Sequence, residues 1–178
     1  MIGVAFALAL AIERTRLWVV FGGSMLMLFV LPWAEPQLPA FISLHWMLNG
    51  EWGLLNNALW ILGGIEGPSW LNERWTALGG AIASHLWKWT PFWTVILLAG
   101  RMSIPQDIYD AAKVDGATGL NSFLFVTFPL LANLYLVLTL LATIFLLGDF
   151  NTVYFVTGGG PNNETHLLAT LGIRNAFD

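Results

Sequence analysis

The longest uninterrupted apolar stretch runs from Phe123 to Leu147 and contains no Asp, Glu, Lys, Arg or His. As an α-helix it would extend about 38 Å, at about 1.5 Å per residue. The hydrocarbon core of a bilayer is about 30 Å thick. The stretch therefore predicts a membrane-spanning helix. We expect a bend at Pro129, because proline removes a backbone donor and kinks a helix.

Two further apolar stretches predict spanning elements of a less regular kind. Leu78–Gly100 is long enough to cross a bilayer, although His85, Lys88 and Pro91 interrupt it. Residues 17–48 hold three closely spaced prolines and predict a broken spanning element. Broken helices at membrane depth are tolerated where protein or a cavity covers the freed backbone groups.

The two ends of the chain are apolar but too short to span. Met1–Ile12 would reach only about 18 Å as a helix, and Leu167–Phe177 is shorter still. Both ends therefore resemble parts of spanning helices. We expect residues 1–178 to form a single transmembrane domain that is a fragment, or an unusually short relative, of a longer protein.

Residues 49–76 have a different composition, rich in glycine and tryptophan. Apolar residues recur at helical spacing between Leu54 and Leu62, and five of the ten tryptophans lie in or next to this segment. Indole rings favour the headgroup level of a membrane. The pattern predicts a short helix lying on the membrane surface.

Composition supports the membrane interpretation. The chain is 57% hydrophobic and 10% charged, whereas soluble domains are about 25% charged. The absence of cysteine excludes disulfides and thiolate metal sites. Seven scattered Lys and Arg residues do not form the basic stripe that nucleic-acid binding requires. We therefore expect an all-α integral membrane protein, a polytopic helical bundle.

The loop charges predict an orientation, because positively charged short loops stay cytoplasmic. The Glu13–Arg16 loop has two arginines, and the loop of residues 101–122 has Arg101 and Lys113. The remaining loops, residues 49–75 and 149–165, share Arg74 alone. The first and third loops are expected in the cytoplasm and the second and fourth outside.

The loop of residues 101–122 carries its own helix signals. Ser103 and Gln106 have the spacing of a capping box, with Pro105 between them. Gly116 is placed to end the helix in a left-handed conformation, and a second helix is expected from about Thr118. Ile108, Ala111, Ala112 and Asp115 would share one face of the short helix. On these residues alone, an ordinary loop helix is the simpler interpretation.

A resemblance changes that interpretation. The string Asp110-Ala111-Ala112-Lys113-Val114-Asp115-Gly116-Ala117, followed by Phe123, Phe128 and Pro129, resembles the EAA motif of ABC importer permeases, with Asp110 where glutamate is usual. Three more landmarks resemble the carbohydrate branch of that family, of the maltose and glycerol-phosphate permease type: Ser103-Ile104-Pro105, Leu31-Pro32-Trp33 and Thr157-Gly158-Gly159-Gly160-Pro161. They occur in the right order over nearly the whole chain.

The resemblance implies a fold, a function and partners. It implies a bundle of the type I ABC importer permease kind in a bacterial or archaeal cytoplasmic membrane, crossing it several times. Such a permease pairs with a second permease subunit, receives a sugar or polyol from an extracytoplasmic solute-binding protein, and docks on a cytoplasmic ABC ATPase dimer. The chain itself would be no enzyme and would bind no cofactor or metal, since ATP is hydrolysed on the ATPase.

The resemblance also assigns the EAA-like residues to ATPase coupling, within a coupling loop of residues 101–122. These residues are Asp110, Ala111, Ala112, Asp115 and Gly116.

Polar residues within or beside the apolar stretches are candidates for the solute path. Lys88 and His85 are three residues apart and share a helix face, and an ionisable residue at membrane depth is a functional candidate. With Trp89 they would offer donors and an aromatic ring to a hydroxyl-rich solute. The alternative is that Lys88 pairs with a carboxylate or a helix end. Asp149 and Asn151 are candidates too, with helix capping as their alternative.

Other functions remain open. The permease could carry a non-sugar solute. An intramembrane enzyme using His85 and Asp149 as acid and base is a weaker alternative, because no constellation at nucleophile or metal spacing accompanies them. A scaffold subunit without a pathway of its own is the third.

Overall fold

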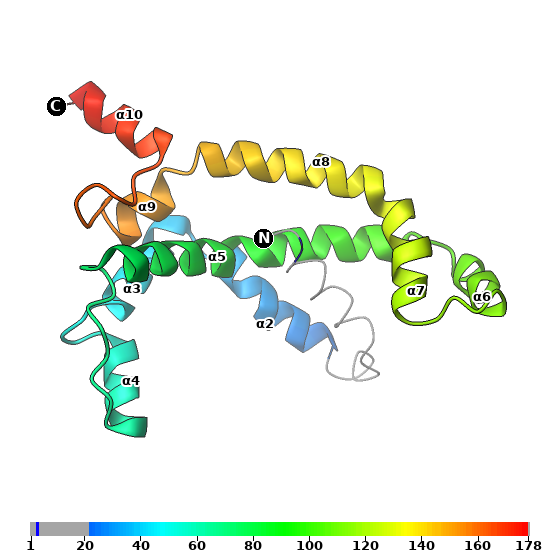
Figure 1. The fold of residues 1–178 in the computed structure, drawn as a ribbon, viewed down its shortest axis with the longest axis horizontal. Helices are drawn as coiled ribbons and strands as arrows, with labels where there is room; N and C mark the ends of the chain where they lie inside the picture. Colours follow the sequence, from blue (N-terminus) through cyan, green and yellow to red (C-terminus); the bar gives the residue numbers. More distant parts are fainter. Residues whose placement is uncertain (1–2, 4–21, 178) are drawn as a thin grey trace. The chain divides into compact units, whose positions relative to one another are not determined.

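The computed structural model describes residue 3 and residues 22–177, and these form helices joined by turns, without a strand among them (Figure 1). The half-span expected at Met1–Ile12 and the loop at Glu13–Arg16 lie outside the described residues. The described chain divides into two compact units, residues 22–30 with 90–143, and residues 31–89 with 144–177. Two long helices, α5 and α8, each contribute residues to both units.

The first unit contains the second half of α5, most of α8 and the short elements between them. In chain order, the two long helices and the short elements that join them are α5 (Arg74–Met102), α6 (Gln106–Val114), α7 (Leu120–Ser122), the π-helical turn η2 (Phe123–Thr127) and α8 (Phe128–Leu147). Gly100 of α5 lies against α8, where a Cβ on this glycine would meet the side chain of Leu134. The missing side chain therefore allows the two helices to approach closely.

The helix predicted at Phe123–Leu147 is present and begins slightly earlier, at Leu120. Among the described residues, Leu120–Leu147 is the one helix long and apolar enough to cross a bilayer, with 28 residues. The ribbon changes direction where η2 meets α8 (Figure 1). Pro129 explains this change, because its ring excludes the carbonyl four residues earlier, and the wider π-helical turn moves that carbonyl away.

The stretch predicted at Leu78–Gly100 lies inside α5, a helix of 29 residues that continues through Pro91. Its length is sufficient for a membrane crossing. The polar residues of α5 keep its mean hydropathy below that of Leu120–Leu147.

The second unit contains the broken element that the sequence predicts. Helix α2 (Gly22–Ala34) holds Pro32, and α3 (Gln37–Met47) begins after Pro36. The residue before a proline disfavours helical backbone angles, so the chain leaves the helix at Glu35. We call residues 32–36 the proline junction.

Helix α3 packs against α9 (Asn151–Val156), which follows α8 after a short break. Phe41 and Leu48 of α3 and Val156 of α9 are buried together, and Trp70 and Leu71 pack beside them. The ring of His45 bonds through Nδ1 to the carbonyl of Val156, at 2.8 Å.

The helix predicted between Leu54 and Leu62 is present as α4 (Leu54–Gly63), and none of its residues is buried. Trp52, Trp60 and Trp75 expose more than half of their surface. The Trp70 side chain donates from Nε1 to the Asn56 side chain at 2.6 Å, and this bond holds the segment between α4 and α5 against α4. The outward, membrane-surface position of residues 49–76 stays a prediction.

Candidate functional site

The short helix α6 ends in a well-formed C-terminal cap. Gly116 has a φ of +84°, a conformation that side chains with a Cβ rarely adopt. The N–H of Ala117 bonds to the carbonyl of Ala112 at 2.8 Å, and the N–H of Gly116 bonds to Lys113 at 3.0 Å. This pair of bonds is a Schellman motif. The left-handed role expected for Gly116 is confirmed.

The capping box expected at the start of α6 is wrong. Pro105 occupies the N-cap position and makes no side-chain cap. The Ser103 hydroxyl instead donates to the carbonyl of Gly100 at 2.7 Å, in the last turn of α5. The Gln106 side chain turns forward to Asp110. Ser103 therefore serves the end of the preceding helix, because α5 continues to Met102 and leaves its carbonyls within reach.

Tyr109 anchors α6 to the longer helices of its unit. It is buried, and its hydroxyl lies 3.0 Å from the Thr127 hydroxyl of η2. The Arg101 guanidinium, at the end of α5, lies 3.7 Å from the centre of the Tyr109 ring, a cation–π arrangement. Sequence reasoning missed this anchor. Its signal was an aromatic residue among the short side chains of this helix.

The face expected to dock on a partner is open in the structure. Ile108, Ala111 and Asp115 are exposed, and Ala112 is half-buried. Alanine side chains leave room for another surface to approach. The coupling role assigned to these residues and to Gly116 by resemblance stays a prediction.

Asp110 lies beside that face and is paired within α6. Its carboxylate accepts from Lys113 Nζ at 2.7 Å and more weakly from Gln106. The Lys113 hydrogen bond, followed by the Gln106 hydrogen bond and the Lys113 charge, lowers the pKa of Asp110 below its usual value. Both side chains of the ion pair are more than half exposed, so the pair adds little stability.

Lys88 lies in the second unit and meets the proline junction. Only 1% of its surface is exposed. Its ammonium donates to the carbonyl of Pro32 at 2.7 Å and to the carbonyl of Glu35, and it lies 3.5 Å from that of Trp33. These carbonyls end α2, where the helix leaves acceptors without intrahelical donors. The sequence offered a carboxylate or a helix end as the partner of Lys88, and this geometry favours the helix end.

His85 and Asp149 come together across 64 positions of sequence. His85 Nδ1 and Asp149 Oδ2 are 2.8 Å apart, and both side chains are largely buried. Asp149 also accepts the N–H of Thr152 at 3.1 Å through its other oxygen, so it caps the first turn of α9. Asp149 therefore joins α5 to the break between α8 and α9.

Trp89 and Asn151 flank this pair. The Trp89 ring lies 6.3 Å from the rings of both His85 and Phe145. Asn151 donates to the Gln37 side chain at 2.6 Å, which links α9 to the start of α3. The five solute-path candidates thus lie within one unit: His85, Lys88 and Trp89 inside α5, and Asp149 and Asn151 where α8 gives way to α9. Their contact with a solute stays a prediction.

Neither metal nor phosphate chemistry finds support among the described residues. They contain no group of three potential metal ligands. The glycines of the Thr157–Pro161 turn precede no Lys-Ser/Thr pair, which a nucleotide phosphate loop requires.

Comparison with known proteins gives consistent results. The family model described as "Binding-protein-dependent transport system inner membrane component" matches residues 3–177. The trehalose/maltose transport system permease protein MalF of Thermococcus litoralis is 39% identical over 171 residues, covering 96% of this chain and 56% of that protein. The sulfoquinovosyl glycerol transport system permease protein SmoG of Agrobacterium fabrum is 34% identical over 94% of this chain and 52% of that protein.

A solved structure shows the same fold. A chain of the bacterial alginate ABC transporter, crystallised with its alginate pentasaccharide-bound periplasmic protein, superposes with a TM-score of 0.85 over 98% of this chain and 62% of that one, at 22% identity. This chain spans about half the length of the curated relatives it matches. The fold is that of a helical membrane bundle, and the chain belongs to the family of inner membrane components of binding-protein-dependent transport systems.

Proposed function

We propose that the full-length protein is a permease subunit of an ATP-driven importer and moves a sugar or related polyol into the cytoplasm. It would cross the membrane several times and pair with a second permease subunit. Relatives named for trehalose and maltose, for sulfoquinovosyl glycerol, and for xylose and arabinose support a sugar-like solute. A solved neighbour that includes a periplasmic protein supports a solute-binding partner.

The observation that carries the proposal is the construction of α6. A short helix with an open alanine face is fixed at its C-terminal end by the Gly116 cap. It is fixed from the side by Tyr109, which contacts Arg101 and Thr127. A helix held so firmly against α5 and η2 moves with them when a partner pushes on its open face. That is the property required to transmit the closure of a separate cytoplasmic ATPase dimer to membrane helices.

The coupling role is tested by charge placed on the open face. Ala111→Arg adds a long cation where a partner must approach closely, and Gln106→Arg adds the same cation at an exposed position on the opposite side of α6. In the full-length protein assembled with its ATPase, Ala111→Arg should abolish ATP-dependent uptake of labelled sugar, while Gln106→Arg retains it. Normal uptake by both variants at normal expression would remove α6 from the coupling path.

The topology is tested by labelling. Single cysteines at Lys113 and Glu164 of the full-length protein should react with an impermeant thiol reagent from opposite sides of the membrane. Lys113→Cys is expected to label from the cytoplasm and Glu164→Cys from outside. Equal labelling of both in intact cells would contradict a multi-pass arrangement with this orientation.

A further inference from the structure

An apolar groove of about 350 Å³ lies along α4, within the second unit. Its lining combines one face of the helix with two side chains of the segment that follows it: Leu55, Ala58, Leu59, Leu62, Ile65 and Trp70. The volume lies within the ~300–1,000 Å³ of small-molecule sites. Aliphatic and aromatic walls favour a hydrocarbon, because burying apolar surface is favourable and burying an unpaired polar group is not.

Helix α4 directs the polar side chain of Asn56 toward the rest of the chain. Asn56 Nδ2 donates to the carbonyl of Gly50 at 2.6 Å and to the carbonyl of Pro68 at 3.3 Å. Its Oδ1 accepts from Trp70 Nε1 at 2.6 Å. A Cβ on Gly67 would overlap the Asn56 side chain, so the segment after α4 lies directly against this side of the helix. The chain itself therefore satisfies the amide group of Asn56.

The apolar side chains of α4 face outward. Ile61 and Leu62 are 78% and 87% exposed, and none of the residues of α4 is buried. Gly64 ends the helix with a φ of +63°. The chain then turns back, and the N–H of Ile65 bonds to the carbonyl of Leu59 at 3.4 Å. An exposed apolar surface of this kind marks a contact with a membrane or with another protein.

Lipid is the contact that suits this surface. The chain belongs to a family of inner membrane components, and Trp52, Trp60 and Trp75 are exposed within or close to α4 in the sequence. Indole rings favour the headgroup level of a membrane, and an interfacial helix buries its apolar face in lipid. At the membrane-surface position predicted for residues 49–76, the groove would open among acyl chains.

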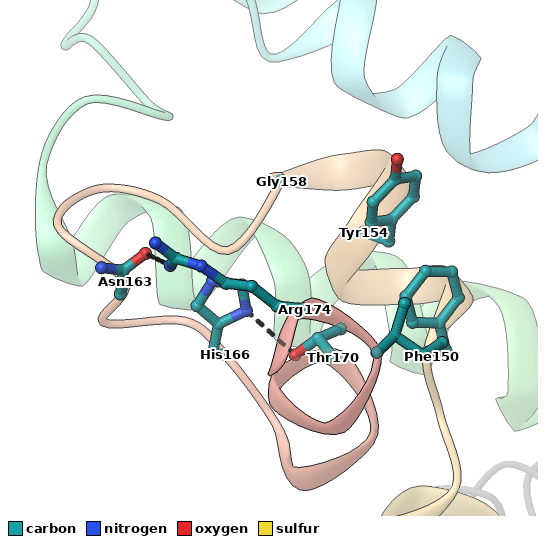
Figure 2. Close-up of a pocket in the computed structure, with 8 residues that line it drawn as sticks. Phe150, Tyr154, Gly158, Asn163, His166, Thr170 and Arg174 are labelled. Carbon is teal, nitrogen blue, oxygen red and sulfur yellow. Dashed lines mark hydrogen bonds between the residues drawn. The ribbon is translucent and has the colours of Figure 1, made fainter. Parts of the chain in front are cut away.

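A second hollow of the same unit lies between α9, the turn that follows it, and α10 (Leu168–Phe177), and it is more polar (Figure 2). There His166 Nδ1 lies 3.0 Å from the Thr170 hydroxyl, and the Arg174 guanidinium donates to Asn163. Bonded pairs of polar side chains thus line this hollow, whereas aliphatic walls line the α4 groove. The α4 groove is therefore the better fit to a hydrocarbon tail.

The charges next to the groove in the sequence are negative. Residues 49–73 have neither Lys nor Arg, and they carry three carboxylates: Glu51, Glu66 and Glu73. Glu66 directly follows the lining residue Ile65 and is exposed. Arg74, the first cation after this segment, lies 3.9 Å from Glu164. The carboxylates repel a head group of net negative charge and attract an ammonium.

From these features we infer that the groove binds one acyl chain of a phospholipid whose head group carries an ammonium, as in phosphatidylethanolamine. The acyl chain packs along the face from Leu55 to Leu62, and the ammonium lies beside Glu66. The inference concerns lipid binding and does not depend on which solute is transported.

The test compares two phospholipids that have identical acyl chains. Phosphatidylethanolamine and phosphatidylglycerol are added to the full-length transporter, purified with its partners in detergent, and bound lipid is counted by native mass spectrometry. The unaltered transporter should bind phosphatidylethanolamine about three- to fivefold more tightly, the scale of an exposed ion pair. Ala58→Phe fills the groove, and Leu62→Ser makes its wall polar. Each variant should lose one tightly bound phosphatidylethanolamine per copy of the chain.

Matched controls separate the groove from the rest of the surface. Ile61→Phe adds an aromatic ring to α4 outside the groove and should retain the lipid. Glu66→Gln should retain the lipid but lose the preference for phosphatidylethanolamine, whereas Glu164→Gln, outside the groove, should keep that preference. Leu62 is 87% exposed, so Leu62→Ser keeps the test decisive should Ala58→Phe fail to fold.

Three results would overturn the inference: equal binding of the two lipids by the unaltered transporter, lipid retention by both Ala58→Phe and Leu62→Ser, or the same loss in Ile61→Phe. Lipid retention combined with weaker binding of the solute-binding protein in Ala58→Phe would also overturn it, because the groove would then be a protein contact.

Discussion

The α6 cap and the proline junction both interrupt helices, but they satisfy the freed backbone groups in different ways. At α6 the bonds are local: Gly116 and Ala117 return to carbonyls three and five residues earlier. At the proline junction the donor is Lys88, more than fifty residues away in sequence and almost fully buried. The local backbone cap depends on one residue that can adopt left-handed backbone angles. The long-range cap depends on a charged side chain that is buried away from water.

This difference predicts opposite sensitivities. The stability of the α6 region should change little when an exposed charge is removed, and it should fall when the backbone of the cap is altered. The proline junction should fail when a side chain is neutralised, because buried acceptors without a partner are costly.

The largest expected effect on stability follows from Lys88→Met. The substitution keeps the length of the side chain but leaves the carbonyls of Pro32 and Glu35 without their donor. We expect the full-length complex to lose about 1–3 kcal/mol of stability, the scale for leaving buried acceptors without a donor. Thermal unfolding in detergent would measure this as a lowered midpoint.

Lys113→Met is the control, since it removes an exposed lysine from α6. Should Lys88→Met unfold like the wild type yet change which sugar is taken up, Lys88 would belong to the solute path and not to the helix end. Equal loss in both variants would remove the contrast between the two regions.

The second effect concerns the pair His85–Asp149. A double-mutant cycle with His85→Ala and Asp149→Ala should give a coupling of about 2 kcal/mol, within the range for contacting residues. The pair is largely buried and 2.8 Å apart. The Arg74–Glu164 pair, 3.9 Å apart and more exposed, provides the comparison cycle, with an expected coupling of about 0–1 kcal/mol. A coupling near zero for His85–Asp149 would mean that burial adds nothing to this contact.

The third effect is on backbone conformation at the α6 cap. Gly116→Val forces a β-branched residue into left-handed backbone angles and should cost about 1–2 kcal/mol. Since Val also loosens the orientation of α6, we expect ATP-dependent uptake to be lost although the protein still inserts. Gly79→Val is the matched control, because Gly79 has an ordinary helical φ and open space around it. Normal uptake in Gly116→Val would separate the cap from coupling.

The same contrast explains what the sequence could and could not predict. The spanning helix, the break among the prolines and the left-handed Gly116 follow from patterns within a few residues, and all are present. The capping box failed because Ser103 had two helix ends within reach, and the end of α5 took its hydroxyl.

Contacts across long stretches of sequence could not be predicted. The sequence named helix ends and carboxylates as partners for Lys88, but it could not choose the carbonyl groups of Pro32 and Glu35. The bond between Asn151 and Gln37 spans 114 positions, and no periodicity connects them. Such pairs depend on how helices pack, which the sequence pattern leaves undetermined.

The smallest expected effect concerns the pH dependence of the Asp110–Lys113 pair. Hydrogen bonds from Lys113 and Gln106 lower the pKa of Asp110 in the folded protein. A lowered folded-state pKa means that the contribution is fully present above the unfolded-state pKa and is lost as the pH falls through the folded-state pKa. The difference in unfolding midpoint between wild type and Asp110→Asn should therefore be small at neutral pH and vanish at acidic pH.

Salt sharpens this last prediction, because both side chains of the pair are more than half exposed and screening weakens exposed charges. Raising the ionic strength to about 1 M should remove the small neutral-pH difference, whereas the effect of Gly116→Val should persist because backbone strain carries no charge. A large, salt-resistant loss in Asp110→Asn would instead mean that its carboxylate makes a buried contact in the assembled transporter, and the α6 region would then depend on charge as the proline junction does.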